Sequence, residues 1–321
     1  MPLVRLLLPA ICALAVAGAA GAATHGSDPL RSADWSLRAA HVPAAWRARP
    51  VRASPIVAVL DSGVDETQPD LRGAFVDGAD LVGGPAGDIN GHGTLVAGVV
   101  AARAGNGIGA AGVCPVCRVM PLRVVGANGE AAQPAIAAAV VWATDHGARV
   151  INMSFVVPTA TPELADAVAY AQSRGVLLFA GAGNDGGTEA AYPAALPGVV
   201  GVAAVDAGRR LYDWSRRGSW VRVAAPGCAI STADRGRYLS FCGTSAATAF
   251  AAGVAGLLLA ADPAARAEDL TAALVGTARP IDPQLSFGAV DAAAALERLL
   301  PRPPHKRGGP PKRASHVTAG P

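Results

Sequence analysis

The stretch FCGTSAATAFAAGVAGLLLAA, residues 241–261 of a chain of 321, places Ser245 among small residues at the start of a long apolar run. A serine at a tight turn that enters a helix exposes its hydroxyl near the positive end of the helix dipole, where it can act as a nucleophile. The same serine could instead only cap the helix, because its side chain can satisfy an N–H group of the first turn. The nucleophilic interpretation requires a general base and an acid that orients this base.

Asp61 and His92 are the candidates for this acid and this base. Asp61 ends the apolar run VAVLD, and His92 stands in NGHGT at the start of a helix rich in small residues. Taken singly, the aspartate could cap a turn and the histidine could simply begin its helix. The motifs D-S-G, H-G-T and G-T-S follow one another along the chain, and this combination favours catalysis far more than any of the three residues alone.

Short valine-rich runs predict the strands that would position these residues, and they suit strands buried on both faces. They cover residues 55–61, 118–125, 148–155, 175–183 and 198–205. Residues 131–147 and 162–175 have helical composition and end at glycine. This alternation predicts an α/β fold, a three-layer α/β/α sandwich with a mostly parallel, doubly wound central sheet. Active sites in such sheets gather at the carboxyl ends of the strands, where Asp61 falls.

On these motifs, residues 35–291 resemble the subtilisin-like serine proteases, the subtilase family. The resemblance implies a subtilisin-like fold, with Ser245 as the nucleophile, His92 as the general base and then acid, and Asp61 as the acid that orients the imidazole. Asn184, in LLFAGAGNDG, matches the side-chain donor of the family's oxyanion hole. The resemblance therefore implies a serine endopeptidase that hydrolyses peptide bonds.

The resemblance also implies where a substrate would bind. Ser154 and Phe155, in INMSF, match the strand that pairs with the substrate backbone and forms one wall of the P1 pocket. Gly181, Ala182 and Gly183, in AGAG, match the opposite wall. Because these walls are small and uncharged, we expect a medium-sized apolar or aromatic residue at P1.

Two further details concern the shape of this pocket. The segment AYPAA matches the base of the pocket, so the resemblance implies a cis peptide bond between Tyr192 and Pro193. An ordinary surface turn is the alternative for this segment. Val156 stands where the family usually carries glycine, and we expect its side chain to narrow one subsite.

The composition and net charge of the chain limit the classes of partner that we expect it to bind. The net charge of +3 is slight, and no basic stripe with interleaved aromatic residues occurs, so we expect no nucleic-acid partner. We expect one peptidase domain over residues 55–300, preceded by a lead-in segment over residues 23–54. We expect this domain to act as a monomer on protein or peptide substrates.

The two ends of the chain have compositions of their own. Residues 1–22 combine a basic start, a short apolar stretch and a small-residue cleavage site, which predicts a cleaved signal peptide and a secreted or periplasmic protein. A membrane anchor is the alternative, but this stretch is short for a span. The apolar run of residues 246–261 is also short for a span, so we expect it to form a buried core helix. We therefore expect no stable membrane insertion. Residues 301–321 are rich in proline, glycine and basic residues, which predicts a disordered tail.

Four cysteines follow the predicted signal peptide, and an even number in an exported chain favours disulfides. Cys114 and Cys117, in CPVC, predict a local bridge, with a redox motif or half of a metal site as the alternative. The segment CAISTADRGRYLSFC reads as a hairpin with Cys228 and Cys242 symmetric about its turn. We therefore predict a disulfide between these two residues, with two buried free thiols as the alternative.

The chemistry implied by the resemblance needs no cofactor. Asp70, in TQPDL, and Asn106, in AGNGIG, match positions of one structural calcium site of the family. Ordinary turn residues are the alternative at both positions.

Two other functions compete with the endopeptidase. A catalytically silent relative could serve as a binding or scaffolding protein, although an intact set of Asp61, His92, Ser245 and Asn184 argues against it. A serine esterase or transpeptidase could use the same side chains.

Overall fold

The computed structural model describes residues 28–84, 87–126 and 129–300. The predicted signal peptide, the first residues of the lead-in segment and the predicted tail lie outside the described residues.

The central sheet consists of β1 (Ile56–Asp61), β2 (Ala79–Asp80), β3 (Arg118–Arg123), β4 (Val150–Met153), β5 (Leu177–Gly181), β6 (Val200–Val205), β7 (Val221–Pro226), β10 (Arg279–Pro280) and β11 (Gly288–Ala289). Within the described residues these nine strands follow the order β10-β11-β7-β6-β5-β4-β1-β3-β2. All neighbouring pairs are parallel except β10 and β11. The predicted α/β fold with a mostly parallel sheet is confirmed.

The strand order reverses at β1. The chain passes from β1 to β2 and β3 on one side, then returns across β1 to β4 and continues to β5, β6 and β7 on the other. In an open parallel sheet such a reversal leaves a crevice at the carboxyl ends of the strands, and ligands bind there. Asp61 is the last residue of β1, so the topology places it at this crevice.

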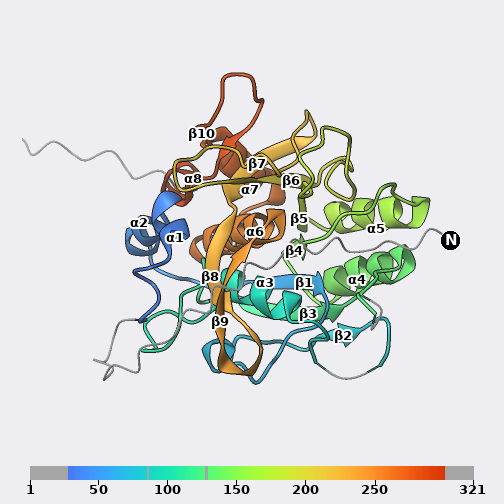
Figure 1. Ribbon diagram of the computed structural model, residues 1–321, viewed down its shortest axis with the longest axis horizontal. Helices are drawn as coiled ribbons and strands as arrows, with labels where there is room; N and C mark the ends of the chain where they lie inside the picture. The colour runs from blue at the N-terminus through green and yellow to red at the C-terminus, as the bar shows by residue number, and fades with distance from the viewer. Residues whose placement is uncertain (1–27, 85–86, 127–128, 301–321) are drawn as a thin grey trace, which may run out of the picture.

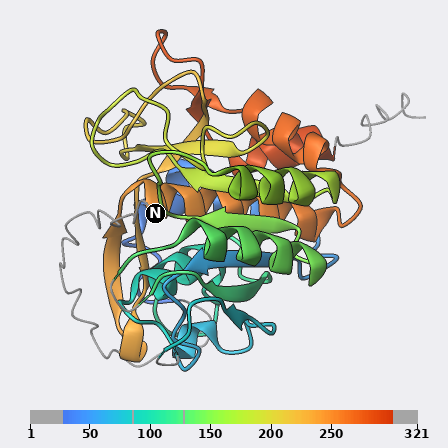
Figure 2. The same ribbon diagram turned by 90° about the vertical axis from the view of Figure 1, so that its right-hand side faces the viewer.

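Helices cover both faces of the sheet (Figure 1). One layer consists of α4 (Gln133–Asp145) and α5 (Pro162–Ser173). The other contains α3 (His92–Ala101) and α6 (Thr244–Ala261), together with α1 (Trp35–Ala39), α2 (Val42–Ala48), α7 (Ala267–Gly276) and α8 (Ala292–Leu299). Figure 2, turned by 90°, shows α4 and α5 in front of the sheet and α6 behind it. The predicted three-layer sandwich is therefore present.

Side chains along β1 alternate between the two layers. Val57 and Val59 belong to the core formed with α3 and α6. Ala58 and Leu60 belong to the core formed with α4 and α5. Because successive residues of a strand point to opposite faces, Asp61 faces the layer of α3 and α6.

α6 lies at the centre of its layer, and all 18 of its residues are buried. By length and composition it is the one helix of the described residues that could cross a membrane, but the whole of it lies inside the protein. This burial agrees with the core helix predicted for residues 246–261. The small residues of α6 let neighbouring segments pack closely against it. At Gly256, for example, an added Cβ atom would lie only 2.6 Å from Cys117 Sγ.

A separate hairpin leads into α6. It consists of β8 (Cys228–Thr232) and β9 (Tyr238–Cys242), joined by a turn that contains the short 3₁₀ helix η2 (Asp234–Gly236). The hairpin predicted from the sequence is thus confirmed. Only Gly243 separates β9 from α6, so the position of the hairpin directly sets where α6 begins.

Candidate active site

Asp61 and His92 form a buried pair between the end of β1 and the start of α3. The Nδ1–H group of His92 donates to Asp61 Oδ1 at 2.7 Å, and the two side chains are 6% and 4% exposed. Asp61 Oδ1 also accepts a hydrogen bond from the backbone N–H of Ser62 at 2.8 Å. Asp61 Oδ2 is buried and has no hydrogen-bond partner among the described residues. The carboxylate therefore fixes the proton on Nδ1 and leaves Nε2 of His92 as the basic nitrogen.

Asp88 fastens the start of α3, a role that the sequence analysis missed. Its carboxylate accepts hydrogen bonds from the backbone N–H of Thr94 at 2.8 Å and from the Thr94 hydroxyl at 2.6 Å. It also accepts one from the backbone N–H of Gly91 at 2.9 Å. Gly91 is the N-cap of α3 and has no side chain for this task, so Asp88 provides the cap from three residues upstream.

Ser62 connects this cap to the Asp61 side of the site. Its hydroxyl donates to Asp88 at 2.7 Å and accepts a hydrogen bond from the backbone N–H of Gly93 at 3.1 Å. Ser62 directly follows Asp61, and Gly93 directly follows His92. The hydrogen bond between Ser62 and Gly93 therefore fixes the positions of Asp61 and His92 relative to each other. A serine after the predicted acid and an aspartate four residues before the predicted base were the available sequence signals.

The charges around His92 favour its protonated form. Burial by itself lowers the pKa of His92, but the charge of Asp61, its hydrogen bond and the more distant charge of Asp88 together raise the pKa above the usual value. An imidazole with a raised pKa accepts a proton more readily. This is the property required of a general base.

Ser245 is the second residue of α6, and its side chain points to β4. Its hydroxyl donates to the carbonyl of Ser154 at 3.0 Å. No hydrogen bond joins Ser245 to His92 within the part of the chain that the structure describes. The ring of Phe241, four residues before Ser245, packs edge-on against the His92 ring at 5.4 Å between centroids. This contact places the imidazole beside the segment that enters α6. Hydrogen bonds between catalytic groups are often long or poorly aligned before substrate binds.

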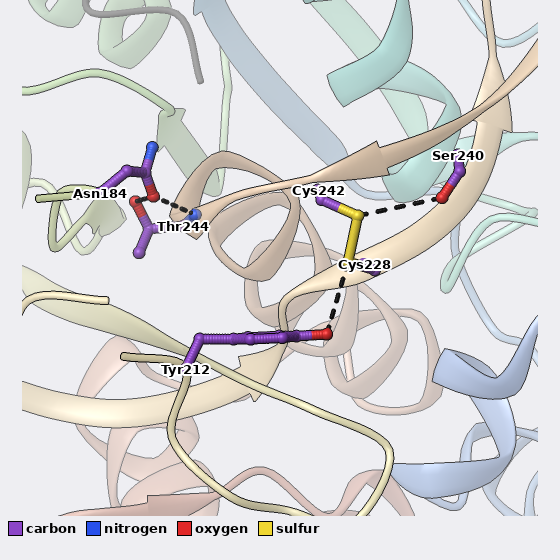
Figure 3. Close-up of a disulfide and its surroundings, with 6 residues drawn as sticks. All are labelled: Asn184, Tyr212, Cys228, Ser240, Cys242 and Thr244. Carbon is purple, nitrogen blue, oxygen red and sulfur yellow. Dashed lines mark hydrogen bonds between the residues drawn. A yellow bond between two sulfur atoms is a disulfide. The ribbon is translucent and has the colours of Figure 1, made fainter. Parts of the chain in front are cut away.

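Asn184 follows β5 and lies against the start of α6 (Figure 3). Its Oδ1 accepts hydrogen bonds from the backbone N–H of Thr244 at 2.8 Å and from the Thr244 hydroxyl at 3.0 Å. The Thr244 hydroxyl in turn accepts one from the backbone N–H of Gly183 at 3.1 Å. With Oδ1 held in this way, the Nδ2 group of Asn184 is turned away from Thr244 and is free to donate.

The predicted substrate walls are buried and lie on neighbouring strands. Ser154 and Phe155 follow β4, while Gly181 ends β5 and is followed by Ala182 and Gly183. β4 and β5 pair in parallel, so both segments leave the sheet at the same edge. The peptide bond between Tyr192 and Pro193 is cis, as the resemblance implied.

An ion pair beside this wall was missed from the sequence. Arg216 Nε and Nη2 each lie 2.5 Å from one carboxylate oxygen of Asp185. The Arg216 side chain passes so close to Gly183 that a Cβ atom there would lie 2.9 Å from Arg216 Cδ. The sequence signal was Asp185 directly after Asn184, but its partner is 31 residues away. We expected an uncharged wall, and an ion pair whose two charges cancel lies next to it.

Both predicted disulfides are present, joining Cys114 to Cys117 and Cys228 to Cys242. Cys228 and Cys242 are register partners in the hairpin of β8 and β9. Figure 3 shows this bridge near the turn that holds Thr244, with the hydroxyl of Tyr212 beside Cys228. The bridge therefore anchors the backbone just before α6.

Asp70 and Asn106 lie together, and a second acid joins them. Asn106 Nδ2 donates to Asp70 Oδ1 at 2.6 Å, and the backbone N–H of Ala110 donates to Asp70 Oδ2 at 3.2 Å. Asp28 accepts hydrogen bonds from the backbone N–H groups of Gly105 and Asn106. Burial, together with the charge of Asp28, raises the pKa of Asp70 to about 6, although its hydrogen bonds work against this rise. No group of three or more His, Cys, Asp or Glu side chains suited to a metal occurs in the described ranges.

Comparisons with known proteins agree with this arrangement. Residues 52–308 match the sequence profile of the Subtilase family, peptidase S8. The thermophilic serine proteinase of Bacillus sp. (strain AK1) is 42% identical over 205 residues, which are 63% of this chain and 51% of that relative. Thermitase from Thermoactinomyces vulgaris is 39% identical over 228 residues, which are 70% of this chain and 81% of thermitase.

The fold has a solved counterpart as well. A protease structure from Pseudoalteromonas arctica PAMC 21717 superposes with a TM-score of 0.79 at 30% sequence identity, covering 86% of this chain and 100% of the other. The sequence matches, the shared fold and the buried Asp61–His92 pair thus all indicate a serine protease of this family. The chain belongs to the subtilase family and is a serine-type endopeptidase.

Proposed function

We propose that this endopeptidase cleaves peptide bonds with Ser245 as nucleophile, His92 as general base and acid, and Asp61 as the orienting carboxylate. The observation that carries the proposal is the 2.7 Å hydrogen bond from His92 Nδ1 to Asp61. This hydrogen bond engages Nδ1 of His92 with the carboxylate. It leaves Nε2 to accept the proton of Ser245 at the start of α6. A silent scaffold protein would have no need for such a buried pair of ionisable groups.

The reaction begins when Ser245 Oγ attacks the scissile carbonyl carbon and transfers its proton to Nε2 of His92. Asp61 stabilises the imidazolium that forms. The carbonyl oxygen becomes an oxyanion, which accepts hydrogen bonds from Nδ2 of Asn184 and from the backbone N–H of Ser245. His92 then gives its proton to the leaving amine as the C–N bond breaks. A water molecule, deprotonated by His92, hydrolyses the acyl-enzyme and restores the serine.

The substrate pocket lies between the segment of Ser154 and Phe155 and the segment of residues 181–183. Its walls favour a medium-sized apolar or aromatic P1 residue. Asp185 does not attract a basic P1 side chain, because Arg216 already binds both of its carboxylate oxygens. Val156 narrows one subsite.

A calcium ion held by Asp28, Asp70 and Asn106 is part of the proposal. Asp28 and Asp70 are 3% and 0% exposed, and their hydrogen bonds come from neutral donors. Two buried carboxylates without a positive partner are unfavourable, and calcium prefers such oxygen ligands. The ion would stabilise the loop of residues 105–110 and take no part in the reaction. Calcium should raise the melting temperature relative to a chelator, and this gain should shrink below about pH 6, where Asp70 binds a proton.

An extracellular or periplasmic location completes the proposal. Two disulfides support it, because such bonds persist in oxidising compartments.

Replacement of Ser245 by alanine tests the proposed chemistry. A serine-directed fluorophosphonate should label the wild type and not Ser245→Ala, and a peptide library should be cleaved only by the wild type. Circular dichroism of the variant shows that the fold is intact. Peptide cleavage by Ser245→Ala at the wild-type rate would refute the assignment. Labelling of the wild type with cleavage of esters alone would favour an esterase.

A further inference from the structure

The amino-terminal edge of the sheet contains a groove with a volume of about 1150 Å³. Its floor comes from residues at the starts of β4, β5, β6 and β7, among them Arg149, Val176, Gly198 and Arg222. The end of α5, one face of α7 along its whole length and Arg298 in the last turn of α8 form its sides. The crevice that holds Asp61 is at the opposite, carboxyl-terminal edge, so the groove is separate from the active site.

The groove is strongly basic. It is lined by one glutamate, Glu268, and by five arginines: Arg149, Arg174, Arg222, Arg266 and Arg298. Arg266 pairs with Asp269 at 3.0 Å, and Arg149 donates to the carbonyls of Pro263 and Ala265. The other three guanidinium groups have no ion pair or hydrogen bond to any part of the chain that the structure describes.

Arg222 is the most informative of these three arginines. It is the second residue of β7, whose other five residues are all buried. Arg174 and Arg298 stand near the ends of α5 and α8, where a positive charge interacts favourably with the helix dipole. Arg222 lies in a strand and not at a helix end, so no helix dipole stabilises its positive charge. Its side chain is exposed and makes no ion pair or hydrogen bond within the described residues, so its guanidinium is available to an anion outside the protein.

We propose that this groove binds a linear inorganic polyphosphate, because its lining among the described residues has no aromatic side chain on which a nucleic-acid base could stack. A guanidinium donates two parallel hydrogen bonds to an oxyanion. The arginines approach from a strand and from two helices, and a tetrahedral phosphate can accept from several directions, whereas a carboxylate offers two oxygens in one plane. The groove is larger than a typical pocket for a single small ligand, so several phosphates of one chain fit along it. Binding there leaves the catalytic crevice at the opposite edge of the sheet open.

Binding of long-chain inorganic polyphosphate to the full chain tests this proposal. The groove variant carries Arg174→Gln, Arg222→Gln and Arg298→Gln, in a Ser245→Ala background that prevents self-digestion. The control variant carries Arg47→Gln, Arg72→Gln and Arg209→Gln, which lie on the exposed surface outside the groove. Both variants lose the same charge and both keep the basic residues of 301–321, so any binding by that segment is equal.

The groove variant should bind polyphosphate at least about tenfold more weakly than the control at about 0.15 M salt. The slope of log K against log salt should be about two units shallower, as expected for the loss of three phosphate contacts. Polyphosphate should leave the rate of small-peptide cleavage by the active enzyme unchanged. Equal losses in the two variants would overturn the proposal, and so would polyglutamate of the same length binding as tightly as polyphosphate.

Discussion

Ser154 and Ser245 hold each other through two reciprocal hydrogen bonds. The Ser245 hydroxyl donates to the Ser154 carbonyl at 3.0 Å, and the Ser154 hydroxyl donates to the Ser245 carbonyl at 3.1 Å. Nδ2 of Asn152, inside β4, donates to the Ser154 hydroxyl at 2.9 Å and fixes its orientation. The end of β4 therefore positions the first turn of α6. In the proposed reaction, the Ser245 hydroxyl must break its bond to the Ser154 carbonyl before its proton can pass to His92.

The replacement Ser154→Ala tests this positioning. It removes the bond to the Ser245 carbonyl but keeps the backbone of the substrate wall. One neutral hydrogen bond contributes about 1 kcal/mol, so kcat should fall about fivefold with little change in KM. Ser173→Ala is the control, because that exposed hydroxyl donates only to the carbonyl of Tyr170 in its own helix, α5. A change confined to KM would mean that the Ser154 hydroxyl contacts substrate and does not position Ser245.

The replacement Asp88→Asn tests the charge near the base. Asp88 helps to raise the pKa of His92, so removing its charge should lower that pKa. His92 must be neutral to accept a proton, and the acidic limb of kcat/KM should therefore move to lower pH. Asp145→Asn, on the exposed surface, removes the same charge away from the site. An equal shift in both variants, or a shift to higher pH, would contradict the role of Asp88.

The replacement Arg216→Gln tests the ion pair beside the P1 wall. Without Arg216, the Asp185 carboxylate becomes available to a basic side chain. The ratio of kcat/KM for a P1 lysine substrate to that for a P1 phenylalanine substrate should therefore rise. The double variant Arg216→Gln, Asp185→Asn should bring the ratio back to the wild-type value. If the single variant keeps the wild-type ratio, Asp185 does not face the pocket.

The disulfide between Cys228 and Cys242 should support both stability and activity. It closes a loop with a sequence separation of 14 residues, and such a loop contributes about 3 kcal/mol in the chain-entropy model. Replacing both cysteines by alanine should lower the melting temperature. It should also lower kcat well below that temperature, because the bridge anchors the backbone that leads to Ser245.

Replacement of Cys114 and Cys117 by alanine is the matched control. This bridge spans a sequence separation of 3 residues and lies in the core of the α6 layer. Its loss should change kcat much less than the loss of the hairpin bridge. Equal kcat in both double variants would show that the hairpin bridge does not affect the position of Ser245.

The features predicted well from the sequence are those with a local pattern. The apolar runs located β1, β3, β4, β5 and β6, because each strand is buried on both faces. The run that ends in VAVLD also placed Asp61 correctly at the carboxyl edge of the sheet. The hairpin of Cys228 and Cys242 could be read from its symmetric spacing.

The features missed depend on contacts between distant parts of the chain. β7 was not predicted from the sequence, because Arg222 and Pro226 interrupt its apolar pattern. Arg222 is also one of the arginines that line the groove described above. α1 and α2 were only a lead-in segment in the sequence. Their place is fixed partly by His41, which contacts the Asp291 carboxylate at 2.8 Å from 250 residues away. Asp88 was not singled out from the sequence, because its contacts with Ser62 and Thr94 depend on the fold.

Mapping the site of covalent modification tests whether Ser245 is the nucleophile. The wild-type protein is treated with a serine-directed fluorophosphonate until peptide cleavage stops, then digested and analysed by mass spectrometry. We expect one equivalent of label on the peptide that contains Ser245, with labelling slowed when His92 is replaced by alanine. Complete inactivation with the label on any other residue would contradict it.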